Sequence, residues 1–142
     1  MKLNEHFDIR EFVPPEIWRA YAENSVWFID PRTVAIATAY REHFRCPVII
    51  NNWHTGGSLT MRGYRPPDAK TGARLSQHRF GRAFDCHFIG VTVQDAFREI
   101  VANFAKFHAV GLTTLEDVAH TPTWLHSDCR ATQKNEPLIV RP

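Results

Sequence analysis

The feature of this sequence that most restricts its fold is a long stretch without hydrophobic periodicity, from Asn51 to Gln77. It contains four of the seven glycines of the chain and the pair Pro66–Pro67. Loops of this length are uncommon inside a compact domain, where they are usually either functional or disordered. The stretch separates a helical part of the chain, before residue 51, from a part with mostly strands, after residue 77.

Two helices and one strand are predicted before this loop. The first helix follows Pro14–Pro15 and covers roughly residues 16–23, where apolar residues recur at helical spacing. The second begins with Asp30 as its N-cap and a proline in its first turn, and it ends near Phe44. The apolar run 48–50 then predicts a short buried strand.

After the loop, apolar and polar residues alternate over 82–89, which predicts a strand with one polar face. An apolar stripe over 93–107 predicts a third helix, and two short strands are expected near 110–116 and 123–129. Because helices come first and strands mostly follow, the chain is predicted to form an α+β domain. We expect a single compact domain over 1–142, with a small, largely antiparallel sheet and helices packed on it.

Composition excludes several classes of protein. Hydrophobic residues make up 44% of the 142 residues and charged residues 23%, which excludes a disordered tail, a collagen-like fibre and a coiled coil. No apolar run approaches the length of a membrane span, and the first residues lack the apolar core of a secretory signal. The net charge of +2, without a Lys/Arg block, gives no reason to expect nucleic acid as a partner.

The three cysteines, Cys46, Cys86 and Cys129, form no Cys-x-x-Cys pair. An odd number without metal-type spacing argues against a disulfide framework and indicates synthesis in a reducing compartment, the cytoplasm. By strand alternation, Cys86 and Cys129 are expected to be small buried apolar groups.

The strongest local signal is the pattern S-x-H-x-x-G-x-A-x-D, from Ser76 to Asp85. It places His78 at the end of the loop and Asp85 inside the predicted strand, and Gly81 permits a sharp turn between them. The small Ala83 lies on the same strand face as Asp85 and leaves room above it. The seven-residue spacing also fits one helix face, but the glycine and the alternation argue against a helix here.

A third ligand is available on the last predicted strand, where His126 follows Asp85 by 41 residues. Imidazole nitrogen and carboxylate oxygen suit Zn²⁺, which binds them at about 2.0–2.2 Å. Two histidines, one aspartate and an open position for water are typical of a catalytic zinc site. His87 lies on the same face as Asp85 and is expected to be an ordinary strand histidine, so His78, Asp85 and His126 are the predicted ligands.

At these residues the chain resembles the M15 family of zinc peptidases, which includes D-Ala-D-Ala carboxypeptidases and phage endolysin peptidases. The three predicted ligands match the family's metal motif, and Gly63–Tyr64–Arg65–Pro66 is similar to its S-G-Y-R segment. The opening pair His6–Phe7 and the order of elements also agree, so the resemblance covers nearly the whole chain. It implies a compact fold with one zinc site and hydrolysis of a peptide bond in the peptide stems of bacterial peptidoglycan.

The general base is where this chain departs from the family. Many members have an acidic residue three positions before the last histidine ligand or a histidine two positions before it, but here Thr123 and Trp124 occupy these positions. Hydrolysis requires a group that takes a proton from the attacking water. Glu116 is our first candidate for it, with Asp128 and His120 as alternatives. Asp128 equally suits a role in orienting a metal ligand.

Other residues are predicted to contact the substrate. Arg65, from the segment that resembles the family motif, would polarise the scissile carbonyl or hold a substrate carboxylate, with Arg62 as an alternative. Trp53 and His54 are candidates for a wall of the cleft, and Ser76 is expected to shape the loop before the first ligand and to contact substrate.

The leading hypothesis is therefore a zinc metallopeptidase that acts on the peptides of bacterial cell wall. Without a secretory signal or an attached wall-binding module, two contexts fit it. One is a phage lysin released through a separate membrane lesion, and the other is a cytoplasmic enzyme that acts on wall precursors or fragments. Two rivals stay open: a non-catalytic zinc-bound binding or virion-structural module, and a zinc hydrolase acting on a non-wall peptide.

Overall fold

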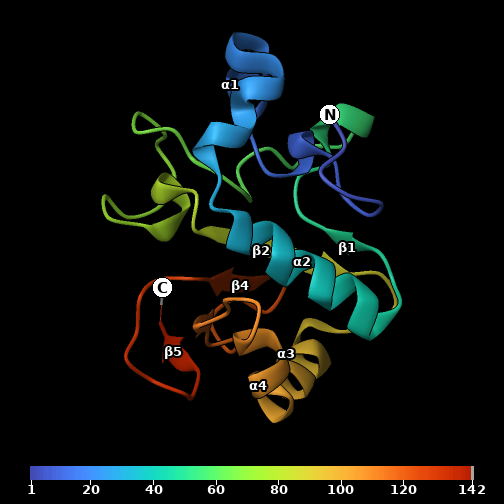
Figure 1. The fold of residues 1–142 in the computed structure, drawn as a ribbon, viewed down its shortest axis with the longest axis vertical. Helices are drawn as coiled ribbons and strands as arrows, with labels where there is room; N and C mark the ends of the chain where they lie inside the picture. Colours follow the sequence, from blue (N-terminus) through green and yellow to red (C-terminus); the bar gives the residue numbers. More distant parts are fainter. Residues whose placement is uncertain (142) are drawn as a thin grey trace.

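The computed structural model of the protein describes residues 1–141 and contains short helices around one five-stranded sheet (Figure 1). The α-helices are α1 (Pro15–Tyr21), α2 (Pro31–Phe44), α3 (Val93–Ala102) and α4 (Phe104–His108). The 3-10 helices are η1 (Ile9–Glu11), η2 (Ala22–Phe28), η3 (Trp53–Thr55) and η4 (Gln77–Phe80). The strands are β1 (Val48–Ile49), β2 (Ala83–Phe88), β3 (Thr114–Glu116), β4 (Leu125–Asp128) and β5 (Leu138–Val140). No helix among residues 1–141 is long and apolar enough to cross a bilayer.

The sheet has the strand order β1-β2-β4-β3-β5. Every neighbouring pair is antiparallel except β3 and β5, which are parallel. This arrangement confirms the predicted α+β class with a small, largely antiparallel sheet. The edge strand β5 was not predicted, because three residues are too few to establish an alternating pattern.

The predicted helices form, except that the third is divided into two. Asp30 caps α2 as expected, since its carboxylate accepts a hydrogen bond from the Arg32 backbone N–H at 3.0 Å. The single helix predicted over 93–107 is wrong, because the chain breaks at Asn103 into α3 and α4. The Asn103 side-chain amide donates to the Glu99 carbonyl oxygen at 2.9 Å, and such local side-chain bonds compete with a continuing helix.

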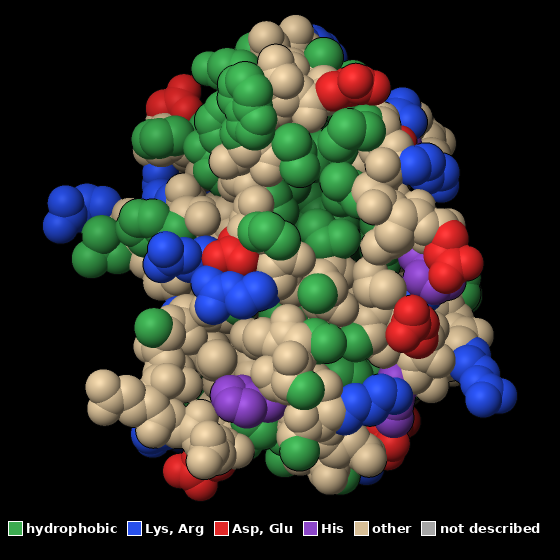
Figure 2. Space-filling view, viewed as in Figure 1, with side chains coloured by type: hydrophobic (Ala, Val, Ile, Leu, Met, Phe, Trp, Pro, Cys, Tyr) green, Lys and Arg blue, Asp and Glu red, His purple; other side chains and the backbone are tan. Residues whose placement is uncertain are grey.

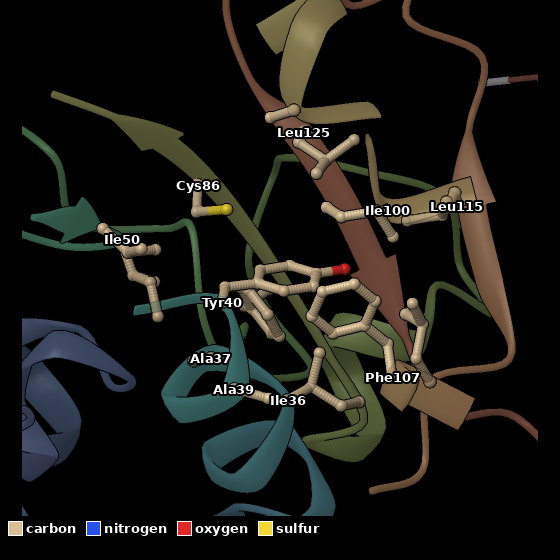
Figure 3. Packing of buried hydrophobic residues seen from close by; sticks show 14 of the residues in the cluster. Ile36, Ala37, Ala39, Tyr40, Ile50, Cys86, Ile100, Phe107, Leu115 and Leu125 are labelled. Atoms are coloured by element: carbon tan, nitrogen blue, oxygen red, sulfur yellow. The ribbon is translucent and has the colours of Figure 1, made fainter. Parts of the chain in front are cut away.

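The core lies between one face of the central strands and the helices α2, α3 and α4 (Figure 3). Tyr40 of α2 is fully buried at its centre, packs edge-on against Phe107, and shares a hydrogen bond of 2.9 Å with the Ser127 hydroxyl. Cys86 and Cys129 are free and buried, as predicted. Because β2 and β4 give alternate residues to this core, their other residues form a second face, which holds the candidate site.

A separate apolar surface lies over the N-terminal helices. Figure 2 shows hydrophobic side chains gathered in the upper part of this view, where α1 lies in Figure 1. The large apolar residues that stay exposed in α1 and η2 are Tyr21, Val26 and Trp27. This surface shares no residue with the candidate site described below.

One charge pair near the N-terminus predicts a pH-dependent contribution to stability. Asp8 caps η1, and its carboxylate accepts hydrogen bonds from the Arg10 side chain at 2.7 and 3.1 Å. Burial raises the pKa of Asp8, but the hydrogen bonds from Arg10 outweigh it and hold the pKa well below its ordinary value. Since the folded pKa is below the unfolded one, the stabilisation is complete above about pH 4 and is lost as the pH falls toward the folded pKa.

We therefore expect Asp8→Asn to cost about 1 kcal/mol of unfolding free energy at pH 7 and progressively less between pH 4 and pH 2. Urea unfolding of both proteins across this range measures the difference. Stability curves that stay parallel down to pH 2 would contradict the assignment.

Candidate metal centre

The three predicted metal ligands lie together although they are far apart in sequence. His78 comes from η4, Asp85 from β2 and His126 from β4, and all three are buried. The Asp85 Oδ1 atom is 3.2 Å from His78 Nε2 and 2.9 Å from His126 Nδ1, and the two ring nitrogens are 3.1 Å apart. The buried group can therefore hold a metal ion.

The register of the sheet explains how two of these side chains meet. Asp85 and His126 are directly opposite each other on the antiparallel strands β2 and β4. Their neighbours Cys86 and Leu125 point into the core, so alternation sends the two ligands to the other face. Residues from two strands thus reach one point without any strain in the backbone.

Gly81 brings the third ligand to the same point. It has φ +66°, which favours glycine, and a Cβ atom there would lie 2.0 Å from the Phe28 carbonyl oxygen. The turn ends η4 directly before β2, so His78 folds back over the strand that carries Asp85. This is the turn that the sequence pattern predicted between the two ligands.

The outward nitrogens of both histidines already have acceptors. His78 Nδ1–H donates to the Gly63 carbonyl oxygen at 2.8 Å, and His126 Nε2–H donates to the Asp128 carboxylate at 3.1 Å. In the neutral rings, the nitrogens that face each other and Asp85 therefore carry lone pairs. Three lone pairs directed at one point repel one another unless a proton or a metal ion lies between them, and the spacing of the three ligand atoms allows either.

Protons compete with a metal for this position. Burial lowers the pKa of His126, but the carboxylates of Asp128 and Asp85 outweigh it and raise the pKa to about 9. Burial dominates for His78 and lowers its pKa. Burial raises the pKa of Asp85, but the two histidines outweigh this and hold it well below its ordinary value. A metal ion must displace the proton of His126, so its affinity should fall as the pH falls.

Asp128 orients a ligand instead of facing the cleft. Its side chain is completely buried, and besides His126 Nε2 it accepts hydrogen bonds from the Arg130 backbone N–H and Nε at 3.0 and 2.9 Å. Of its two sequence-based interpretations, the geometry fits the orienting role and not that of a general base.

We expect Asp128→Asn to lower the zinc affinity by roughly 10–100-fold, because the variant loses the charge that fixes the His126 ring and increases its basicity. Competition against a chromogenic chelator measures the affinity. Asp117→Asn is the matched control, since Asp117 lies in the turn after β3 and its side chain contacts only Ala119 and His120 of that turn. Equal affinity in Asp128→Asn and the unmodified protein would remove Asp128 from the site.

The candidate metal centre lies in a cleft of about 620 Å³, a size typical of sites for small ligands. One wall is formed by residues of the long loop, and the other by residues of the last strands and the turns beside them. The lining residues beyond the three ligands are Arg65, Thr71, Gly72, Ala73, Leu75, Ser76, Gln77, Glu116, Trp124, Arg130, Val140 and Arg141. The predicted residues Arg65, Ser76 and Glu116 are therefore brought together with the metal ligands.

Arg65 is held against the metal ligands. Its Nε donates to the Met61 carbonyl oxygen and its Nη2 donates to Asp85 Oδ2, both at 2.7 Å. Glu116 is half-buried at the end of β3, where it is in register with Val140 of β5, and within residues 1–141 its side-chain carboxylate forms no hydrogen bond or ion pair. Its carboxylate is thus available to a molecule in the cleft.

Besides Asp128, four candidates do not line the cleft: Arg62, Trp53, His54 and His120. Arg62 instead has its Nη1 2.8 Å from His87 Nδ1, on the side of β2 toward β1, and Trp53 Nε1 donates to the Val13 carbonyl oxygen. His120 lies in the exposed turn after β3, beside Asp117. The structure therefore does not bring the side chains of Arg62, Trp53 and His54 to the cleft in which they were predicted to contact substrate.

Cleft residues on the last part of the chain were not predicted from the sequence. Val140 and Arg141 line the cleft because β5 pairs with β3, and β5 itself was too short to predict. Arg130 lies just after the end of β4, two residues beyond the buried Asp128, and this spacing was the available signal for it.

Comparisons of the chain with protein-family models, with curated proteins and with solved structures found no match. The resemblance to the M15 peptidases therefore depends on the motif residues alone and stays a prediction. What the structure adds is the convergence of those residues in one cleft.

Proposed function

We propose that the protein is a zinc-dependent peptidase of the M15 type that hydrolyses a peptide bond in the stems of bacterial peptidoglycan. The observation that carries this proposal is the position of the buried His78, Asp85 and His126 group. It lies in a cleft that also contains an arginine and an unpaired carboxylate. These are the groups that amide hydrolysis by an activated water requires.

Zinc is the metal that the donor set favours. Two imidazole nitrogens and one carboxylate oxygen, without sulfur, match catalytic zinc sites that keep one position open. A zinc ion bound here would lower the pKa of a water molecule toward about 7 and polarise a substrate carbonyl. The chain's own contribution is to fix both rings through Gly63 and Asp128 and to keep the site buried.

Arg65 and Glu116 supply the remaining chemistry. Two nitrogens of the Arg65 guanidinium already have partners, Met61 and Asp85, so its Nη1 is left to bind the oxygen of a scissile carbonyl or a substrate carboxylate. The Glu116 carboxylate accepts a proton from the attacking water and passes it to the leaving amine. Both groups line the same cleft as the metal ligands.

The charge of the cleft fits an acidic peptide. Arg65, Arg130 and Arg141 line it, whereas Glu116 is its only acidic residue besides Asp85 within residues 1–141. Stem peptides of peptidoglycan carry free carboxylates, which such a surface attracts.

The test is to incubate the zinc-loaded protein with purified peptidoglycan and with soluble stem peptides, and to analyse the products by mass spectrometry. We expect loss of a terminal residue or of a peptide cross-link, abolished by a chelator and by His126→Ala and restored by zinc in the unmodified protein. The mass of the product identifies the bond. Absence of any cleavage with zinc bound would overturn the proposal.

The alternative is a non-catalytic zinc-bound binding or virion-structural module. The observation that favours it is the presence of Thr123 and Trp124 at positions where many M15 peptidases have an acidic residue or a histidine. It predicts zinc binding and association with a wall or virion component without hydrolysis, which the same experiment distinguishes.

A further inference from the structure

Arg79, the residue after the ligand His78, makes an unusual set of contacts. Its guanidinium donates hydrogen bonds to four backbone carbonyl oxygens of the long loop. The partners are Ala73 through Nε at 3.2 Å, Pro66 through Nη1 at 3.2 Å, Pro67 through Nη1, and Ala69 through Nη2 at 2.8 Å. A single side chain therefore binds both ends and the middle of the segment 66–73.

This segment has little other structure to hold it. It contains no helix or strand, most of its residues are exposed, and its own backbone contributes a single turn, from the Ala69 N–H to the Pro66 carbonyl oxygen. Buried apolar contacts that order a loop elsewhere are thus largely missing here, and segments of this kind open easily. The planar guanidinium, with five donors in a fixed geometry, replaces the missing backbone hydrogen bonds.

The same segment forms one wall of the cleft. Thr71, Gly72 and Ala73 line it, opposite the side formed by β3 and β5. Gly72 has φ +85°, and a Cβ atom there would lie 2.8 Å from Arg65 Nη1. Gly72 of this wall therefore lies beside Arg65 Nη1, the nitrogen that we propose binds substrate.

Arg65 itself does not depend on this wall. Its bonds to Met61 and Asp85 come from outside the segment 66–73. Release of the segment should consequently open the space in which a substrate binds and leave Arg65 and the metal ligands in place.

We propose that Arg79 is a positioning residue that clamps the segment 66–73 as a wall of the cleft and thereby determines how tightly substrate binds. The role in substrate binding rests on the proposed function, whereas the clamp itself does not. Arg79 does not line the cleft, so this role needs no contact between Arg79 and substrate.

The clamp is tested by trypsin, which has two exposed sites inside or next to the segment, at Lys70 and Arg74. We expect Arg79→Gln and Arg79→Lys to raise the rate of cleavage at both sites by about tenfold or more, because neither side chain can bind four carbonyls. Arg82→Gln is the matched control. It removes the same charge three residues later, but Arg82 contacts Phe80 and Asp30 and not the segment.

Thermal unfolding and zinc affinity of each variant show whether the change is local. We expect both to stay close to those of the unmodified protein, with faster cleavage confined to Lys70 and Arg74. Cleavage of Arg79→Gln at the unmodified rate would overturn the clamp, and so would equally faster cleavage at sites throughout the chain.

Kinetics test the consequence for substrate. We expect Arg79→Gln to raise KM about tenfold and to change kcat less than about twofold, since the loss is one of binding and not of the reacting groups. A fall in kcat with constant KM would contradict the positioning role. If the unmodified protein hydrolyses no stem peptide, the proposed function fails and the part of the inference that concerns substrate fails with it. The trypsin comparison still decides whether the clamp exists.

Discussion

Zinc added to the metal-free protein is expected to raise its thermal unfolding midpoint by roughly 8 °C. At a free zinc concentration 100 times the dissociation constant, binding to the folded state alone contributes about 2.7 kcal/mol. A domain of this size shifts by roughly 3 °C for each kcal/mol. The folded state binds far more tightly than the unfolded chain because only folding brings His78, Asp85 and His126 to one point.

Two matched variants test whether the zinc-induced shift comes from this site. His126→Ala removes a predicted ligand and should abolish most of the shift. His87→Ala removes a histidine whose ring contacts Arg62 instead, and it should keep the shift. Differential scanning calorimetry with and without zinc measures all three proteins. An equal zinc-induced shift in His126→Ala would show that the metal binds elsewhere.

Glu116→Gln is expected to reduce kcat by about 10²–10⁴-fold, the range typical of a lost general base. The substitution keeps the size of the side chain but removes its ability to accept a proton. Because Glu116 is not among the three residues that converge on the metal position, zinc affinity and unfolding temperature should not change. Hydrolysis of stem peptides by zinc-loaded protein measures the effect.

The control for this variant is Glu136→Gln, which removes an exposed carboxylate in the segment before β5. It should leave kcat unchanged. Full activity of Glu116→Gln with zinc bound would exclude Glu116 as the base. The other two sequence candidates would then be tested in the same assay, although Asp128 is fully buried and His120 lies outside the cleft.

The part of the site nearest the motif could be predicted because its signals are local. Gly81, the alternation of β2 and the spacing of His78 and Asp85 act within ten residues, where turn and strand preferences decide the structure. The position of His126 opposite Asp85 required only that β2 and β4 pair in an antiparallel register, which two strands in a small sheet commonly do.

The errors arose where distant contacts or single side chains decide the structure. Asn103 breaks a helix whose apolar stripe continues across the break, because its amide bonds to the Glu99 carbonyl oxygen. Trp53 and Arg62 belong to the same loop as several cleft residues. Their side chains instead form hydrogen bonds with Val13 and His87, outside the cleft. A β5 of three residues becomes a strand only through pairing with β3, which no local pattern reveals.

The most direct test of the account is an anomalous difference map from crystals grown with zinc, recorded on both sides of the zinc absorption edge. We predict one peak per chain between His78 Nε2, Asp85 Oδ1 and His126 Nδ1, with a water molecule or substrate group as the fourth ligand. A peak elsewhere, no peak at saturating zinc, or a fourth protein ligand such as Glu116 on the metal would contradict the proposed catalytic zinc site.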